Sequence, residues 1–399
     1  MRIVVLAETE QGERRVSLVP TVVKRLVDAG HSVDVVANAG SQAGFEDTDY
    51  LKAGAKVGRQ DELLAKPGVV IAVGGPGIAG YHSSLHSALG PGHVFIGVHD
   101  PLSRPSLMTE LAATGASVMS LDLMPRITRA QSMDVLSSMA TVAGYSAALL
   151  AADRLPKMLP LMMTAAGTIP ASKFLVIGAG VAGLQAIATS RRLGASVEAY
   201  DVRPAAIEQI QSLGARAVSA PTTSADTEDQ GGYAQAQAAD ELLAERQLLA
   251  PHVAEADAII TTAAIPGAAA PVLISTQMVE AMRPGSVIVD LAAARGGNCE
   301  LSKPGITVEH HGIQIIGPTD LASHSASTAS RLYANNVATF LKHLTDDNGD
   351  LKLDPDDEIT VATLVTHDGE VVNSRLVEPV AVLPDPAPAQ NHEPIEESA

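Results

Sequence analysis

The chain has 399 residues, of which 46% are hydrophobic, and its formal net charge is −18. This length is enough for two domains, each with a core of its own. The acidic balance disfavours nucleic acid and anionic lipid as direct partners, because both are negatively charged. The single cysteine, Cys299, excludes an intramolecular disulfide and a cysteine-based metal cluster. We therefore expect a protein of a reducing compartment and no metal site.

Much of the negative charge lies in the C-terminal segment. Residues 346–399 include 14 acidic and two basic side chains. Residues 376–399 are rich in proline and acidic groups, so we expect them to form a disordered acidic tail. A tail solvated by water is the simpler interpretation, and a tail that binds a partner is the alternative.

The sequence predicts neither a secretion signal nor a membrane span. The first residues run directly into a strand pattern. The longest apolar candidate, residues 147–170, is interrupted by three charged residues. We therefore expect a cytoplasmic chain that does not insert into a membrane by itself.

Strands and helices alternate along the first 140 residues. Residues 20–29 form an amphipathic helix pattern with a proline in its first turn. Strand patterns cover residues 3–7, 33–36, 69–73 and 93–98. This alternation predicts a parallel sheet, with glycine-rich turns at the carboxyl ends of its strands.

Two side chains of this region are candidates for chemistry. His99 ends a strand, where it could act as a general acid or base or be a hydrogen-bonded loop histidine. Arg15 precedes the first helix, where it either reaches a ligand in a cleft or pairs with surface acids. The pattern leaves both pairs of alternatives open.

A polar segment follows at residues 125–138. Gln131, Asp134 and Ser138 are three or four residues apart, so they share one face if the segment becomes a helix, with Ser137 beside them. Such a face offers amide, carboxylate and hydroxyl groups, which suit a nicotinamide and its ribose. An exposed helix start with capping residues is the alternative. The small, apolar residues 139–155 then predict a long buried helix that leads into a second domain.

The centre of the chain carries a dinucleotide-binding pattern. An apolar strand pattern at residues 174–177 leads into Gly178-Ala179-Gly180-Val181-Ala182-Gly183 and a helix that extends to Arg192. A second strand, residues 197–200, ends at Asp201. Strand, glycines, helix, strand and acid occur in the order that the motif requires.

Each part of this pattern has a physical role. Gly178 permits a tight turn, Gly180 lets the backbone approach a pyrophosphate, and Gly183 allows close packing of helix on strand. Asp201 can accept hydrogen bonds from an adenosine ribose and would repel a 2′-phosphate, which favours NAD over NADP. Arg203 complicates this choice, because an arginine here can neutralise a 2′-phosphate.

Further α/β units follow the motif. The loop of residues 221–233 lacks periodicity, and loops of this length are commonly lids or disordered. Its last residue, Tyr233, could close over a bound nucleotide. We expect the remaining strands to end at the same sheet edge as the glycine motif. They are predicted at residues 217–220, 258–262, 286–291 and 313–316.

The C-terminal part returns to the first domain. Residues 321–344 predict one helix. Residues 360–366 and 370–372 flank an Asp-Gly turn and predict a β-hairpin. Because an isolated hairpin is only marginally stable, we expect it to pack on other structure, for example on a second subunit.

Several motifs occur in a recognisable order over most of the chain. They read ERRVSLVP, RAQSMDVLSSMATVAGY, GAGVAGLQAIATSRRLGA, AYDVRP, GGYA, TTAAIPG, PGSVIVDLAAARGGNCE and THDGEVV. Across about residues 1–375 the chain resembles the NAD(H)-binding component, or domain I, of the proton-translocating nicotinamide nucleotide transhydrogenases. That family is related in fold to alanine dehydrogenase.

The resemblance implies an α/β fold with two Rossmann-like, doubly wound parallel-sheet domains separated by a cleft. We expect an N-terminal domain at residues 1–140, completed by residues 327–375, and an NAD-binding domain at residues 141–326.

The resemblance also implies a set of functional residues. Arg126, Gln131 and Asp134 would carry the hydride-transfer site, where Gln131 holds the nicotinamide and the other two position the ribose and loop. Tyr233 matches the tyrosine of a mobile loop that closes over the nucleotide. The predicted NAD-binding residues are Arg126, Gln131, Asp134, Ser137, Ser138, Gly178, Gly180, Val181, Ala182, Gly183, Asp201, Val202, Arg203, Gly232, Tyr233, Gln247, Thr262 and Ala264.

The implied reaction is direct hydride transfer between NADH on this chain and NADP held by a partner subunit, coupled to proton translocation. The sequence contains one complete dinucleotide fingerprint and no predicted span, so other subunits would bind NADP and cross the membrane. The resemblance further implies a homodimer, docked through its partners on the cytoplasmic face of the inner membrane.

An alanine dehydrogenase-like enzyme is the first alternative. Those enzymes carry a lysine after the strand that corresponds to residues 69–73 and an aspartate after the one that ends at Asp290. Neither occurs here, and only His99 and Arg15 match. A nucleotide-sensing module without catalysis is the second alternative.

Overall fold

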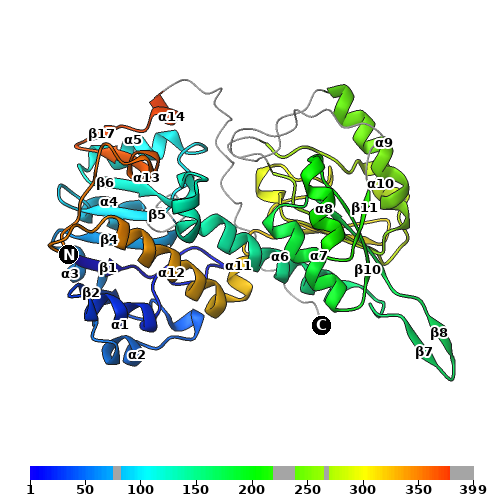
Figure 1. Cartoon of the computed structure of the whole chain (residues 1–399), viewed down its shortest axis with the longest axis horizontal. Helices are drawn as coiled ribbons and strands as arrows, with labels where there is room; N and C mark the ends of the chain where they lie inside the picture. The colour runs from blue at the N-terminus through cyan, green and yellow to red at the C-terminus, as the bar shows by residue number, and fades with distance from the viewer. Residues whose placement is uncertain (75–81, 219–238, 265–268, 378–399) are drawn as a thin grey trace, which may run out of the picture.

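The computed structural model describes residues 1–74, 82–218, 239–264 and 269–377. It has two lobes, and each lobe contains a sheet with helices packed on it (Figure 1). Most strand pairs in both sheets are parallel. The predicted α/β fold with two Rossmann-like domains is therefore confirmed.

The first lobe has an eight-stranded sheet in the order β17-β16-β6-β5-β4-β1-β2-β3. β1 to β6 run parallel, because a helix or helical turn carries the chain back between successive strands. The strands are β1 (Arg2–Val5), β2 (Ser32–Val36), β3 (Lys56–Gly58), β4 (Val69–Gly74), β5 (Val94–Val98), β6 (Ser117–Ser120), β16 (Leu364–His367) and β17 (Glu370–Val371). The helices are α1 (Pro20–Asp28), α2 (Asp47–Lys52), α3 (Gln60–Leu64), α4 (His82–Ala88) and α5 (Pro105–Ala113).

The C-terminal segment closes the edge of this first sheet. The predicted strand at residues 360–366 is partly wrong, because α13 (Glu358–Thr363) takes its first half. Asp357 caps this helix by accepting a hydrogen bond from the Thr360 backbone N–H at 2.8 Å, and the cap outweighs the strand propensity of the sequence. β16 then pairs antiparallel with β6. The hairpin thus packs on the chain's own sheet, and not on a second subunit.

The second lobe has a seven-stranded sheet in the order β11-β10-β9-β12-β13-β15-β14. All its pairs are parallel except β14 with β15, a hairpin whose first strand was not predicted from the sequence. The strands are β9 (Lys173–Ile177), β10 (Ser196–Tyr200), β11 (Arg216–Val218), β12 (Ala258–Thr261), β13 (Val287–Asp290), β14 (Thr307–His310) and β15 (Ile313–Ile316). The helices are α7 (Val181–Arg192), α8 (Pro204–Ser212), α9 (Ala239–Glu255) and α10 (Thr276–Glu280).

Three helices connect the lobes: α6 (Val135–Arg154), α11 (Leu321–His324) and α12 (Ala326–His343) (Figure 1). The predicted single helix at residues 321–344 is broken at Ser325, whose φ of −112° and ψ of 46° are not helical. Buried residues of α12 belong to the core of the first lobe, so this helix returns there as expected. α14 (Ser374–Val377) ends the described chain.

Helix α6 is long and apolar enough to cross a membrane, by length and composition only. The expectation from the sequence did not consider this stretch, although residues 135–152 carry no charged side chain. In the structure α6 packs on α7, α11, α12, β12 and β13. Val135 belongs to the core of the first lobe and Ala147 to that of the second, as expected for a helix that joins two domains.

The polar segment before α6 does not form an α-helix. Residues Thr128–Met133 form a 3-10 helix, and Asp134 is the N-cap of α6. The expected shared face of Gln131, Asp134 and Ser138 is therefore wrong. The carboxylate of Asp134 accepts a hydrogen bond from the Ser137 backbone N–H at 2.9 Å, and this cap sets the start of α6 at Val135.

A second hairpin, β7 (Met162–Thr164) with β8 (Gly167–Ile169), projects from the second lobe (Figure 1). This hairpin was not predicted from the sequence. Met163 is 83% exposed and Leu161 is 61% exposed. Large apolar side chains on a projecting hairpin are typical of a contact surface for another chain.

Candidate nucleotide-binding site

The carboxyl ends of three parallel strands meet at one edge of the second sheet. Gly178, Asp201 and Thr262 follow directly after β9, β10 and β12, which are neighbours in the sheet. A cavity of about 470 Å³ opens between this edge and the start of α6. Open parallel sheets bind nucleotides at such an edge.

The predicted site residues fall into three groups. Those that line the cavity are Arg126, Ser137, Gly178, Gly180, Val181, Ala182, Asp201, Val202, Arg203, Thr262 and Ala264. The structure describes Gln131, Asp134, Ser138, Gly183 and Gln247 but does not bring them to the cavity wall. Gly232 and Tyr233 lie outside the described residues.

The three glycines of the motif occupy different surroundings. Gly178 has a φ of +94°, a backbone conformation that favours glycine. A Cβ atom on Gly183 would lie 1.8 Å from the backbone oxygen of Gly178, so α7 approaches the end of β9 as closely as a glycine permits. A Cβ atom on Gly180 would have nothing within 4 Å. The wall at Gly180 is therefore open to a ligand, which suits the approach of a pyrophosphate.

Asp201 and Arg203 form an ion pair on the cavity wall. Arg203 donates from Nε to Asp201 Oδ1 at 2.9 Å and from Nη2 to Oδ2 at 3.0 Å. The Ala179 backbone N–H also donates to Asp201 Oδ2, at 2.6 Å. Arg203 therefore faces the carboxylate, and this arrangement weakens the case for Arg203 as a 2′-phosphate ligand.

On the opposite wall, the start of α6 presents Arg126 and Ser137. The Ser137 hydroxyl donates to Asp134 Oδ2 at 2.5 Å, so the N-cap aspartate fixes a side chain that lines the cavity. Gln131 is exposed in the preceding 3-10 helix. Asp134 thus acts on the cavity through Ser137.

Helix α9 contributes a residue that was not predicted from the sequence. Glu245 lines the cavity, whereas Gln247, two positions later, is exposed. Residues two apart point to different sides of a helix, which explains this difference. Burial raises the pKa of Tyr200, and the nearby Glu245 raises it further, so the phenol of this cavity residue stays protonated.

Two buried polar residues brace the loops behind the cavity. Asn298 accepts from the Ala263 backbone N–H at 3.0 Å and donates to the Ala263 carbonyl at 2.8 Å. Asp290 accepts hydrogen bonds from backbone N–H groups of Ala292, Asn298 and Cys299. Asn298 thereby fixes the loop after β12. Its place in the GGNCE segment could have drawn attention to it, because buried amides commonly hold backbone.

The first lobe has its own polar groups at the carboxyl ends of its strands. The guanidinium of Arg15 donates to both carboxylate oxygens of Glu13, at 2.8 and 2.5 Å. His99 is fully buried, and neither ring nitrogen has a hydrogen-bond partner among the described residues. Burial lowers the pKa of His99 to about 3, so this imidazole is neutral near pH 7.

The fold and the cavity define a two-domain α/β protein with a dinucleotide-type site in its second lobe. A model of the alanine dehydrogenase/PNT N-terminal domain matches residues 4–143, and one of the C-terminal domain matches residues 147–374. The chain belongs to the alanine dehydrogenase/PNT family, as its resemblance predicted.

Within this family, the chain is more similar to transhydrogenases than to alanine dehydrogenases. An NAD(P) transhydrogenase subunit alpha of Rickettsia prowazekii is 40% identical over 374 residues, which cover 94% of this chain and 96% of that protein. A transhydrogenase structure from Sinorhizobium meliloti has a TM-score of 0.81 at 41% identity and covers 94% of this chain and 99% of its own. An L-alanine dehydrogenase structure has a TM-score of 0.77 at 25% identity, with coverages of 94% and 98%.

Proposed function

We propose that the chain is the NAD(H)-binding component of a proton-translocating NAD(P) transhydrogenase of the Si/Re-specific type, active together with partner subunits. The observation that carries this proposal is the cavity itself. It extends from Gly178 and Asp201 at the sheet edge to Arg126 and Ser137 at the start of α6. A dinucleotide with its adenosine at the first end places its nicotinamide toward the second.

The glycine motif would bind the adenosine half. The open space above Gly180 and the N-terminus of α7 receive the pyrophosphate. Asp201 receives the ribose hydroxyl groups, with Val202 beside it and Thr262 and Ala264 on the neighbouring strand end. When the ribose binds, Asp201 exchanges or shares its bonds to Arg203. This exchange favours a ribose without a 2′-phosphate, and thus NAD.

The segment before α6 would bind the nicotinamide half. Ser137 offers a hydroxyl group that Asp134 fixes, and Arg126 offers a positive charge. Gln131 lies in the exposed 3-10 helix, from which it reaches the nicotinamide only if the segment or a partner closes on the site. Ser138, Gln247 and the loop with Gly232 and Tyr233 join the site on closure in this proposal.

The reaction needs little acid or base catalysis. Hydride passes from C4 of one nicotinamide to C4 of the other, so no proton has to be taken from the substrate by a side chain. The chain contributes position, orientation and exclusion of water. A transhydrogenase therefore requires no protonated histidine in this lobe, which agrees with the low pKa of His99.

The assembly also belongs to the proposal. The chain would form a homodimer through the exposed apolar side chains of the β7–β8 hairpin. One partner subunit would bind NADP and another would span the membrane, and the complex would lie at the cytoplasmic face of the inner membrane. The domain boundaries 1–140 with 327–375, and 141–326, belong to the same proposal, as does a disordered tail from residue 376.

An alanine dehydrogenase-like activity is less well supported. The matching Arg15 is paired with Glu13, and the matching His99 is buried and neutral near pH 7. A group that must donate a proton to an oxo acid needs a pKa nearer to the working pH.

The test supplies NADH with two acceptors: pyruvate with ammonium, and NADP bound to a purified NADP-binding transhydrogenase domain. We expect transfer only to bound NADP, and we expect Gln131→Asn or Asp134→Asn to slow it. Ser132→Ala is the matched control, since Ser132 is exposed and its side chain is not proposed to touch the nucleotide. Turnover with pyruvate and ammonium would refute the proposal.

A further inference from the structure

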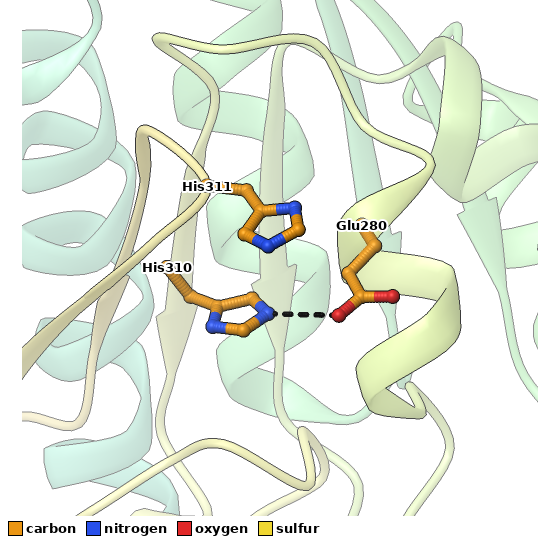
Figure 2. A group of neighbouring side chains, drawn as sticks. All are labelled: Glu280, His310 and His311. Carbon is orange, nitrogen blue, oxygen red and sulfur yellow. Dashed lines mark hydrogen bonds and ion pairs between the residues drawn. The ribbon is translucent and has the colours of Figure 1, made fainter.

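A cluster of three metal-ligand side chains lies at the far edge of the second sheet. His310 ends β14, His311 follows in the turn to β15, and Glu280 ends α10. Figure 2 shows the two imidazole rings side by side, with the carboxylate of Glu280 directed toward them. These residues come from two elements, none of them lines the nucleotide cavity, and the proposed function makes no use of them.

The distances between the ligand atoms are close to those of a metal site. One ligand atom from each residue can be chosen so that all lie within 4.8 Å of one another. His310 Nε2 and Glu280 Oε1 are 3.2 Å apart. A tetrahedral Zn²⁺ site with bonds of about 2.0–2.2 Å has ligand atoms roughly 3.3–3.5 Å apart. This pair already has nearly the separation of two zinc ligands.

The third ligand needs only a rotation of its side chain. The rings of His310 and His311 are stacked, with centroids 4.4 Å apart and an angle of 9° between planes. Stacked rings cannot both direct a nitrogen at one ion, so His311 has to turn about its side-chain bonds. His311 is exposed and has room for this turn.

The turn holds His311 in an uncommon backbone conformation. His310 pairs with Ile313, which leaves His311 and Gly312 as the two turn residues, with φ values of +51° and +75°. Two-residue hairpin turns of this kind favour asparagine, aspartate or glycine at the first position. A histidine here gains nothing for the turn, but it places a second imidazole beside the first.

We propose that Glu280, His310 and His311 form a zinc-binding site on the surface of the second lobe. Two imidazoles and one carboxylate would hold the ion, and water would occupy the fourth position. The ion would tie the end of α10 to the β14–β15 hairpin at the edge of the sheet. This site corrects our expectation from the sequence that the chain has no metal site, which rested on its single cysteine.

The test uses the purified full-length chain without a polyhistidine tag, after treatment with a chelator. Co²⁺ is titrated first, because its visible absorption reports the ligand geometry, and Zn²⁺ is then added to displace it. We expect one tight equivalent of Zn²⁺ per chain. We also expect Zn²⁺ to raise the midpoint of thermal unfolding, since an ion that binds only the folded state stabilises it.

Three variants locate the site. His311→Asn retains a residue that suits the turn, and Glu280→Gln retains a hydrogen-bond partner for His310, so both should fold. Loss of a ligand in each should weaken Zn²⁺ binding by more than about tenfold, since even changes to residues behind the ligands cost that much. His324→Asn is the matched control, because His324 is 43% exposed and also lies near a carboxylate, that of Asp320.

The outcomes decide the proposal. It stands if the tight equivalent disappears in His311→Asn and Glu280→Gln and persists in His324→Asn, while NADH binding stays the same in all three. It fails if the parent chain binds no Zn²⁺, or if the two ligand variants bind Zn²⁺ as tightly as the parent.

Discussion

Gly183 and Gly180 are three positions apart, yet alanine should affect them in opposite ways. A Cβ atom on Gly183 would lie 1.8 Å from the Gly178 backbone oxygen, whereas such contacts are essentially never under 3.0 Å. Gly183→Ala must therefore push α7 away from β9 by roughly 1.2 Å. Overpacking of this kind costs about 1–3 kcal/mol, and the backbone contact places the cost at the upper end.

Gly180→Ala should leave the fold almost unchanged, because nothing lies within 4 Å of its Cβ atom. The new methyl group would occupy the space that we assign to the pyrophosphate. Loss of one hydrogen bond to a charged group costs about 1.5–3 kcal/mol, which corresponds to NADH binding weaker by roughly 10- to 100-fold.

Two measurements separate the variants. Chemical unfolding gives the free energy of unfolding, and the fluorescence of NADH gives its affinity, without overlap from tryptophan, which the chain lacks. We expect a stability loss for Gly183→Ala and an affinity loss at full stability for Gly180→Ala. If Gly183→Ala were as stable as the parent, or if Gly180→Ala bound NADH normally, the packing argument or the pyrophosphate position would be wrong.

Four further changes test other regions of the site and assembly. Asp201→Asn should weaken NADH binding by about tenfold or more and improve NADPH binding relative to NADH, since Arg203 loses its carboxylate; an unchanged preference in titrations with both nucleotides would contradict this. Asn298→Ala leaves backbone groups of the loop after β12 without their partner, so unfolding should become easier by about 1–3 kcal/mol in urea, and equal stability would refute the bracing role. His99 has a pKa of about 3 in the fold against 6.5 ordinarily, so its contribution to stability is present above pH 6.5 and is lost as the pH falls toward 3, by at most about 1.4 kcal/mol per pH unit. His99→Leu should flatten this dependence when unfolding is compared at pH about 5 and about 7, and an equally steep loss would show that other groups cause it. Met163→Asp should convert a dimer to monomers in sedimentation experiments, and a dimer that persists would exclude the β7–β8 hairpin as its main contact.

The nucleotide motif could be predicted from the sequence because its components are local. A strand, three glycines, a helix and Asp201 lie within about 30 residues, and each component has a separate physical requirement. The parallel sheets could also be predicted, since strand and helix patterns alternate regularly. What places Gly178, Asp201 and Thr262 side by side is then the general geometry of such sheets.

Other features depend on contacts between distant regions of the chain. Asn298 holds the loop after β12 from about 35 residues away, and no local pattern signals that contact. Glu245 lines the cavity because of the orientation of α9, which no local pattern predicts. Near the C-terminus, the cap by Asp357 outweighed a strand-like sequence. At residues 131–138 the cap by Asp134 broke the periodicity on which a shared helix face depended.

The pairing of β16 with β6 affects how the chain can be made. On the ribosome, residues 117–120 leave long before residues 364–367, and the whole second lobe emerges between them. During that interval β6 is an unprotected strand edge, of the kind that invites association with other chains. Completion of the N-terminal sheet is thus the last step of synthesis. A nascent chain that stalls after the second lobe should be prone to aggregate, although its nucleotide site is already complete.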